Sequence, residues 1–177
     1  MRTTPEEPRP KDSVAGGDSG ERPLYTRALA RLARRDHARG ELAAWLRRHG
    51  GDEDTLNAVL DRLAAEGYLD DERYARERLR VLLRRGKGLL LIRAELTAVG
   101  LARELVDRCL AETRGAALAS AAELCHRRLG SGWERDPGRV ARARQLLARR
   151  GYEAATLRAL LRGEDHELDE DPPREEP

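Results

Sequence analysis

The residues whose types and spacing best suit chemistry form a short basic turn, Arg84-Arg85-Gly86-Lys87-Gly88. A glycine-rich turn that carries a lysine is a candidate phosphate-binding loop. This turn lacks the spacing of a nucleotide-binding loop and the Ser or Thr that would hold magnesium. We therefore interpret it as a helix end, where glycines let the backbone turn and the helix dipole favours basic side chains.

Two carboxylates, Asp70 and Asp71, stand at the other end of the same amphipathic stretch. They could be a metal-binding pair, but we favour a helix N-terminus, where carboxylates accept hydrogen bonds from unpaired amides. Cys125-His126 has no further ligand at metal spacing. We therefore expect no catalytic residue, no metal site and no cofactor. The histidines are scattered along the chain at His37, His49, His126 and His166.

The elements that must position these residues are predicted to be helices. Ala, Leu, Arg and Glu dominate, and no stretch alternates with the period of a strand. The chain is 40% hydrophobic but only 3% aromatic, so we expect a core of Leu, Ala and Val. No apolar run approaches the roughly 20 residues that span a bilayer, and the start does not resemble a signal peptide. With only two cysteines, the sequence favours a cytoplasmic all-α protein.

The net charge of +2 conceals a partition of charge along the chain. Residues 163–177 carry eight acidic side chains and one basic, and residues 1–22 carry five acidic and four basic. Residues 23–162 therefore have a net charge of +10. A basic helical body with an acidic tail indicates contact with a polyanion or an acidic groove. Composition alone fits equally well with arginines that only keep the helices soluble.

Three copies of one pattern emerge when Gly50, Gly100 and Gly151 are aligned. Each copy has the spacing of a helix, a glycine stop and another helix, with a further helix in front. Apolar residues recur at shared offsets on both sides of each glycine. In order, they are Leu42, Ile92 and Ala143; Leu46, Leu96 and Leu147; Leu56, Val106 and Leu157; Val59, Cys109 and Leu160; and Leu60, Leu110 and Leu161.

A three-helix unit of this size has little core of its own, so its apolar faces must be covered by its neighbours. Tandem stacking then predicts an elongated, curved, solenoid-like body. The expected repeats are residues 23–69, 70–112 and 113–162, between disordered tails at 1–22 and 163–177. The predicted helices span residues 24–35, 40–49, 53–66, 71–84, 89–99, 102–112, 114–129, 137–150 and 153–162.

Arginine pairs fall mostly at predicted helix ends, which stacking would align along an edge of the solenoid. A basic stripe of this kind would suit an extended, negatively charged partner. Capping of terminal carbonyls is the alternative, and it explains about half of these arginines. The pairs are Arg34-Arg35, Arg47-Arg48, Arg84-Arg85, Arg127-Arg128 and Arg149-Arg150.

Several motifs together resemble the RecX regulatory proteins over about residues 24–162. They are the run from Arg35 to Leu42 (RDHARGEL), the run from Leu63 to Asp71 (LAAEGYLDD) with Tyr74-Ala75, and Gly86-Lys87-Gly88 followed by Ile92, Glu95-Leu96 and Gly100. Arg149-Arg150-Gly151-Tyr152 is similar to that family's ending. The expected structural motif residues are Tyr68, Asp70, Asp71, Tyr74, Gly86, Gly88 and Gly100.

The resemblance implies a modulator of the RecA recombinase, built from tandem three-helix repeats and without catalysis of its own. Such proteins bind the RecA–single-stranded DNA filament and inhibit its extension, ATP hydrolysis and strand exchange, which implies a role in recombination, repair and SOS control. We expect a monomer that reaches the DNA directly or through the filament, with no membrane partner. Basic residues in or beside the motifs are the expected contacts: Arg34, Arg35, Arg39, Arg84, Arg85, Lys87 and Arg93.

Two positions depart from the family pattern. Ala38 stands where the family often has a serine that could cap the next helix, so Asp36 would have to supply the cap. Leu89-Leu90-Leu91 follows the glycine turn, where the family usually has a basic or polar residue. Because three successive leucines cannot all face one core, we expect one of them to be partly exposed.

The arginines also fit a second class, a stand-alone nucleic-acid-binding helical-repeat protein. No unit shows the turn and polar recognition helix expected for reading base edges, which favours the regulator. An enzyme would need a constellation of catalytic side chains, and none is recognisable in the sequence.

Overall fold

The computed structural model describes residues 18–168, with side chains described for residues 20–163. Regular structure in this part of the chain is helical, without a strand, so the predicted all-α class of tandem three-helix repeats is confirmed. The chain divides after Leu69 into two compact units. The second and third helix triplets belong to one of these units, so the division predicted between residues 112 and 113 stays a prediction.

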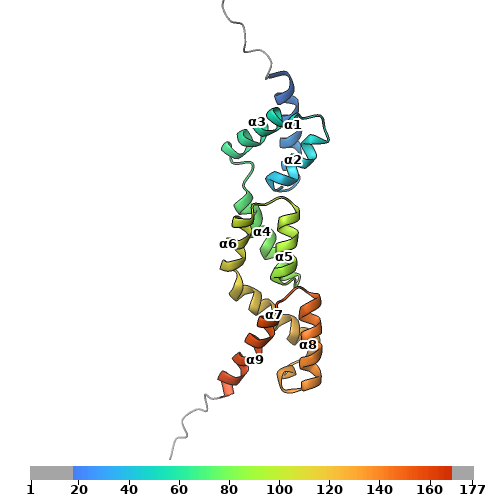
Figure 1. Cartoon of the computed structure of the whole chain (residues 1–177), viewed down its shortest axis with the longest axis vertical. Helices are drawn as coiled ribbons and strands as arrows, with labels where there is room; N and C mark the ends of the chain where they lie inside the picture. The colour runs from blue at the N-terminus through green and yellow to red at the C-terminus, as the bar shows by residue number, and fades with distance from the viewer. Residues whose placement is uncertain (1–17, 169–177) are drawn as a thin grey trace, which may run out of the picture. The chain divides into compact units, whose positions relative to one another are not determined.

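The N-terminal unit contains the first helix triplet, α1 (Asp18–Leu32), α2 (Arg39–Arg47) and α3 (Glu53–Ala65) (Figure 1). Asp52 begins α3 by accepting a hydrogen bond from the Thr55 amide at 3.0 Å. The apolar faces of the three helices enclose an aliphatic core. Its most deeply buried members are Ala28, Leu42, Leu46, Leu56, Val59, Leu60 and Leu63.

The C-terminal unit contains two helix triplets joined through one long helix. Helix α7 contacts α4 and α6 of the second triplet and α8 and α9 of the third (Figure 1). Its apolar residues therefore belong to a core shared by both triplets. The elements are α4 (Asp71–Arg84), α5 (Leu89–Ala98), α6 (Arg103–Glu112), α7 (Arg114–Leu129), the short 3-10 helix η1 (Trp133–Arg135), α8 (Pro137–Arg149) and α9 (Ala154–Leu168).

The three aligned glycines all adopt the left-handed conformation that ends a helix. Their φ angles are 90° for Gly50, 84° for Gly100 and 79° for Gly151. The apolar positions aligned before the glycines are buried in all three copies. Those aligned after them are buried too, except that Leu160 and Leu161 on α9 are partly buried. The repeat pattern therefore marks the core face of each helix pair.

Two helices run further than the sequence predicts. Helix α1 begins at Asp18 and α9 continues to Leu168, so the disorder predicted for residues 18–22 and 163–168 was wrong. Tertiary contact explains the first extension, since Glu21 lies 3.7 Å from Arg62 of α3. In α9, Glu164, Glu167 and Leu168 favour a helix past Gly163, and no proline occurs before Pro172. The tail predictions for residues 1–17 and 169–177 lie outside the described residues.

Burial controls the chemistry of the two cysteines. Cys109 and Cys125 are both buried and unpaired as disulfides. Burial raises the pKa of the Cys125 thiol to about 11, so this thiol is protonated and unreactive at neutral pH. The apolar residues that cover it belong to short amphipathic helices, and no helix within residues 18–168 is long and apolar enough to cross a membrane.

Candidate partner-binding surface

The glycine turn after α4 and the glycine turn after α8 dock backbone to backbone. The Gly88 amide donates a hydrogen bond to the Arg150 carbonyl oxygen at 2.7 Å, and the Leu90 amide donates to the Gly151 carbonyl oxygen at 3.0 Å. A Cβ atom added to Gly88 would lie 2.3 Å from the Gly151–Tyr152 peptide. Position 88 therefore requires glycine because the opposing backbone occupies the space of a side chain.

Side chains brace these docked turns. The Arg150 guanidinium donates to the carbonyl oxygen of Arg85, the C-cap of α4, at 3.1 Å. On α7, the Ser120 hydroxyl donates to the Leu83 carbonyl oxygen at 2.8 Å and lies 3.1 Å from the Tyr152 hydroxyl. The carboxyl ends of α4 and α8 are thus held together by backbone and side-chain hydrogen bonds.

Docking brings two basic clusters to the same place. We call them the basic junction, which consists of Arg84, Arg85, Lys87, Arg149 and Arg150. Arg84, Arg85 and Arg149 are exposed, and none of them forms an ion pair with a carboxylate in the described part of the chain. Their guanidinium groups can therefore bind an external carboxylate or phosphate.

Lys87 differs from its arginine neighbours because its charge is already used within the fold. Its Nζ lies 2.6 Å from Glu95 Oε2, and Arg78 Nε donates to the other Glu95 oxygen at 2.9 Å. Partial burial alone would raise the pKa of Glu95, but the hydrogen bonds from Lys87 and Arg78 outweigh burial and lower this pKa below its ordinary value. Lys87 therefore fixes the turn and is a weaker candidate for partner contact than Arg84 or Arg85.

Arg93, the fourth predicted contact in this unit, is also neutralised. Its guanidinium on α5 forms an ion pair with Asp107 on α6. Asp107 also lies 3.7 Å from Arg103. Arg93 therefore ties two helices together and does not belong to the basic junction.

The three predicted contacts of the N-terminal unit lie after the end of α1 and at the start of α2. Arg34 is exposed just after α1. Arg35 forms an ion pair with Glu41, and Arg39 lies 2.7 Å from Asp61. Arg34 thus differs from Arg35 and Arg39, each of which pairs with a carboxylate of the same unit.

Helix α2 begins differently from the expectation. Its N-cap is Ala38, which is buried and makes no side-chain capping bond, so the cap expected from Asp36 stays a prediction. The Glu41 carboxylate in the first turn instead pairs with Arg35 and lies 3.0 Å from Nδ1 of His37. Burial lowers the pKa of His37, although Glu41 opposes this change.

Most motif residues of the second repeat have architectural positions. Asp70 caps α4 by accepting a hydrogen bond from the Arg73 amide at 2.9 Å, and Asp71 lies in the first turn, where the dipole favours a carboxylate. Tyr74 is buried, whereas Tyr68 is 51% exposed. Gly86 has a φ of 70°, which ends α4.

Sequence reasoning did not include the third triplet among the contact residues. Residues 137–162 contain seven arginines but only one acidic residue, Glu153. Arg142 and Arg149 are exposed and two turns apart on the same face of α8. The sequence of α8 contains no acidic residue, and this could have indicated that its arginines are available to a partner. Arginines on α3 and α4, in contrast, pair with carboxylates.

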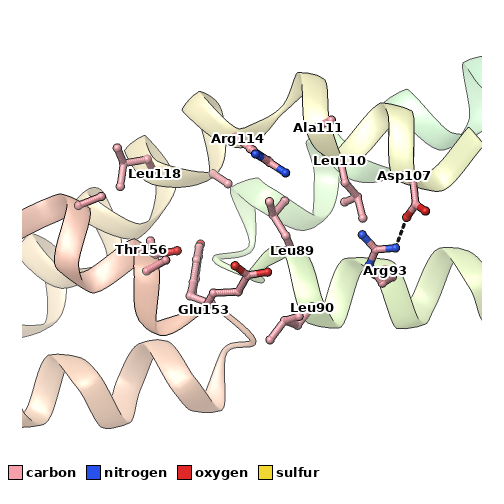
Figure 2. Close-up of a pocket in the computed structure, with 14 residues that line it drawn as sticks. Leu89, Leu90, Arg93, Asp107, Leu110, Ala111, Arg114, Leu118, Glu153 and Thr156 are labelled. Carbon is pink, nitrogen blue, oxygen red and sulfur yellow. Dashed lines mark hydrogen bonds and ion pairs between the residues drawn. The ribbon is translucent and has the colours of Figure 1, made fainter.

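A pocket of about 400 Å³ adjoins the docked turns. We call it the junction groove; Figure 2 shows α5, α6, α7 and the start of α9 around it. Its apolar lining includes Leu89, Leu90, Leu110, Ala117 and Leu118. Its charged lining consists of the Arg93–Asp107 ion pair, Arg114 and Glu153.

The three successive leucines beside the groove are more exposed than predicted. We expected one partly exposed leucine, but Leu90 is 49% exposed and Leu91 is 42% exposed. Gly151 explains the position of Leu91, because a Cβ atom at Gly151 would lie 2.5 Å from Leu91 Cγ. Leu91 therefore packs on the docked turn, and Leu90 lies at the margin of the groove (Figure 2).

Comparison with known proteins identifies the family of this chain. Residues 25–63 match the family model described as RecX, first three-helix domain, and residues 70–110 match RecX, second three-helix domain. The Regulatory protein RecX of Xanthomonas axonopodis pv. citri (strain 306) is 39% identical over 157 residues, covering 89% of this chain and 95% of that protein. The chain belongs to the RecX family.

Other RecX proteins extend the match. The Regulatory protein RecX of Halorhodospira halophila (strain DSM 244 / SL1) is 38% identical over 145 residues, covering 82% of this chain and 90% of that protein. The crystal structure of RecX from Lactobacillus salivarius superposes with a TM-score of 0.72 at 19% identity, covering 85% of this chain and 97% of that chain. The RecX fold is therefore shared across the described triplets, and the chain is a member of a family of regulatory proteins.

The described RecX side chains offer binding chemistry. Among residues 20–163, no group of three or more His, Cys, Asp or Glu side chains is arranged to hold a metal ion. What they offer is guanidinium groups at the basic junction and an apolar groove beside it. Both suit recognition of a macromolecular partner.

Proposed function

We propose that this chain regulates the RecA recombinase by binding the RecA–single-stranded DNA filament and inhibiting its extension, ATP hydrolysis and strand exchange. The observation that carries the proposal is the 39% identity, over 89% of the chain, to a protein named Regulatory protein RecX. The chain acts as a cytoplasmic monomer without catalysis of its own. Its regulatory activity then belongs to DNA recombination, repair and SOS control.

The distribution of unpaired arginines supports this proposal. Arg84, Arg85 and Arg149 at the basic junction, and Arg34 in the N-terminal unit, are exposed and form no ion pair within the described residues. A filament repeats its acidic groups from protomer to protomer, so two basic sites on one chain can engage it at the same time. Several weak contacts on one chain then act together, which raises the effective affinity.

A filament ATPase titration tests the proposed function. Purified protein is added to RecA, single-stranded DNA and ATP, and ATP turnover is followed at increasing protein concentration. We expect inhibition at substoichiometric protein, because one bound chain blocks growth of a whole filament end or segment. No inhibition at an equimolar ratio would contradict the proposal.

The excess of arginine in the third triplet favours a second candidate, a stand-alone nucleic-acid-binding protein. Residues 137–162 carry seven arginines and one carboxylate, and phosphate contacts of this kind give strongly salt-dependent binding. Tight binding to naked single-stranded DNA, with no preference for a RecA-coated strand, would support this candidate. A preference for the coated strand supports the regulator.

A further inference from the structure

The junction groove is lined by aliphatic and polar side chains in similar measure and has an exposed apolar rim. Leu110 and Ala117 are buried in it, and Leu118 is partly buried. Leu90 on the rim is one of three large apolar side chains more than 40% exposed among those described, with Leu91 beside it. A partner that covers this rim removes apolar surface from water, and each Å² of apolar surface buried contributes about 25 cal/mol to the free energy of binding.

The charged side chains at the rim differ in whether they are already paired within the fold. Arg93 and Asp107 neutralise each other across α5 and α6. Arg114, at the start of α7, is exposed and forms no ion pair with a carboxylate within residues 20–163. Figure 2 shows its guanidinium over the groove, with the Glu153 carboxylate beside Leu89. An occupant is therefore favoured if it places a carboxylate near Arg114 and keeps that carboxylate away from Glu153.

The lining favours a protein segment over a nucleic acid. Bases bind by stacking on exposed aromatic side chains, but Tyr152, the aromatic residue of the groove, is 4% exposed and its hydroxyl lies 3.1 Å from the Ser120 hydroxyl. A partly aliphatic pocket of about 400 Å³ instead has room for one or two large apolar side chains.

We propose that the junction groove binds an acidic amphipathic segment of a protein partner, with a large apolar side chain in the groove and a carboxylate paired with Arg114. The groove and the basic junction both adjoin the docked turns. This inference rests on the proposed function, because the partner it implies is a protein component of the filament. In this assignment the groove binds protein, and any contact with DNA phosphates is made by the arginines of the basic junction.

Binding of a model peptide tests the groove directly. The probe is a fluorescent synthetic helix of about 16 residues, long enough for a leucine stripe flanked by glutamates, and its control has glutamine at every glutamate position. Binding to the full chain is followed by anisotropy, with methyl NMR of Leu90 and Leu118. We expect the acidic peptide to bind at least tenfold more tightly than its control and to shift both sets of methyl signals.

Matched variants locate the binding site. Leu90→Glu should weaken acidic-peptide binding at least tenfold, whereas Ala94→Glu places the same charge on an exposed α5 residue outside the groove and should have little effect. Arg114→Ala should weaken binding, with Arg128→Ala on the same helix as its control. Glu153→Gln should tighten binding, because it removes a repelling carboxylate.

Several results would overturn the inference. They are equal binding of both peptides, no binding of either, unchanged methyl signals, or displacement of the peptide by a single-stranded oligonucleotide. The filament ATPase separates this failure from failure of the proposed function. If wild type inhibits the ATPase and Leu90→Glu inhibits it equally well, the groove is not the binding site but the proposed function stands. If wild type does not inhibit, the proposed function is contradicted, whatever the peptide experiment shows.

Discussion

The amide of Gly88 donates a hydrogen bond to the carbonyl oxygen of Arg150 across 2.7 Å, although the two residues belong to different helix triplets. This bond places the basic end of α4 against the basic end of α8 and leaves no space for a side chain at position 88. Because the contact is made by main-chain atoms, it depends on the absence of a Cβ atom at position 88 and not on the charge of the neighbouring arginines. Its strength and the binding role of those arginines can therefore be tested separately.

Replacing Gly88 by alanine should destabilise the C-terminal unit. The new Cβ atom would lie 2.3 Å from the Gly151–Tyr152 peptide, and overpacking against rigid backbone typically costs about 1–3 kcal/mol. Urea unfolding of the full chain measures the loss. Gly115→Ala is the control, because a Cβ atom there meets no atom within 4 Å, and it should not reduce stability. Equal stability of the two variants would show that the docked turns move apart without cost.

Reversing charge at Arg84 and Arg85 should weaken filament inhibition without loss of helicity. Both side chains are exposed and form no ion pair within the described residues, so their replacement by glutamate removes donors without breaking an internal contact. The filament ATPase and the circular dichroism spectrum give the two readouts. If the double variant inhibits as well as wild type, these arginines are not partner contacts.

Adding Lys87→Glu to that double variant should have a different effect. In the wild-type structure the Lys87 ammonium donates a hydrogen bond to Glu95 at 2.6 Å. A glutamate at position 87 would place two like charges there in place of an ion pair. We expect a lower unfolding midpoint in addition to any loss of inhibition. A triple variant as stable as the double variant would show that the Lys87–Glu95 pair does not support the turn.

The contribution of Glu95 to stability should depend on pH. Lys87 and Arg78 lower the pKa of Glu95 in the fold, so its stabilising effect is present above the unfolded pKa of about 4.5 and is lost as pH falls through the lower folded pKa. Glu95→Gln should therefore destabilise the chain at pH 7 by about 1–3 kcal/mol, with a smaller difference from wild type at about pH 3. Thermal unfolding across this pH range measures the difference.

An exposed ion pair provides the comparison for Glu95. Glu77 pairs with Arg80 on the surface of α4, where such pairs contribute about 0–1 kcal/mol. Glu77→Gln should thus change stability at neutral pH much less than Glu95→Gln. A loss from Glu95→Gln that is the same at neutral and at acidic pH would contradict the assigned electrostatic role.

Removing the acidic tail should increase nonspecific affinity for DNA. Residues 169–177 carry five acidic side chains and one basic, and we expect the acidic side chains to compete with phosphates for the arginines of residues 23–162. The truncation is placed after Leu168 because α9 continues to that residue. Binding of a single-stranded oligonucleotide at low and moderate salt measures the change, with a tail of equal length but neutralised carboxylates as the control. Unchanged affinity after truncation would exclude masking by the tail.

Most of the helical architecture followed from the sequence because its causes are local. Asp70 and Asp136 cap helices by hydrogen bonds to amides two or three residues away, and aligned glycines end helices through their own backbone conformation. The apolar offsets around Gly50, Gly100 and Gly151 identified the core face for the same reason. The missed helix extension at Glu21 depends on Arg62, which is distant in sequence.

The candidate site likewise has features that are local in sequence and features that depend on tertiary contacts. Its basic residues and its glycine turn could be read from the chain, and the motifs that resemble RecX include several of them. Whether a basic side chain is already paired within the fold depends on ion pairs between residues from different helices or turns, such as Arg39 with Asp61 and Lys87 with Glu95. These pairs leave Arg84 and Arg85 exposed without an ion pair and make Lys87 part of the fold.

The sequence alone determined that the chain is helical and where glycines separate its helices, because helix propensity, capping and periodicity act within a few residues. Its motifs also identified the family that the chain resembles. Only the tertiary structure decided that Gly88 and Gly151 meet, that Arg149 and Arg150 join Arg84 and Arg85, and that a groove opens beside Leu90. Those outcomes depend on packing between segments more than 50 residues apart, where no local preference specifies the partner.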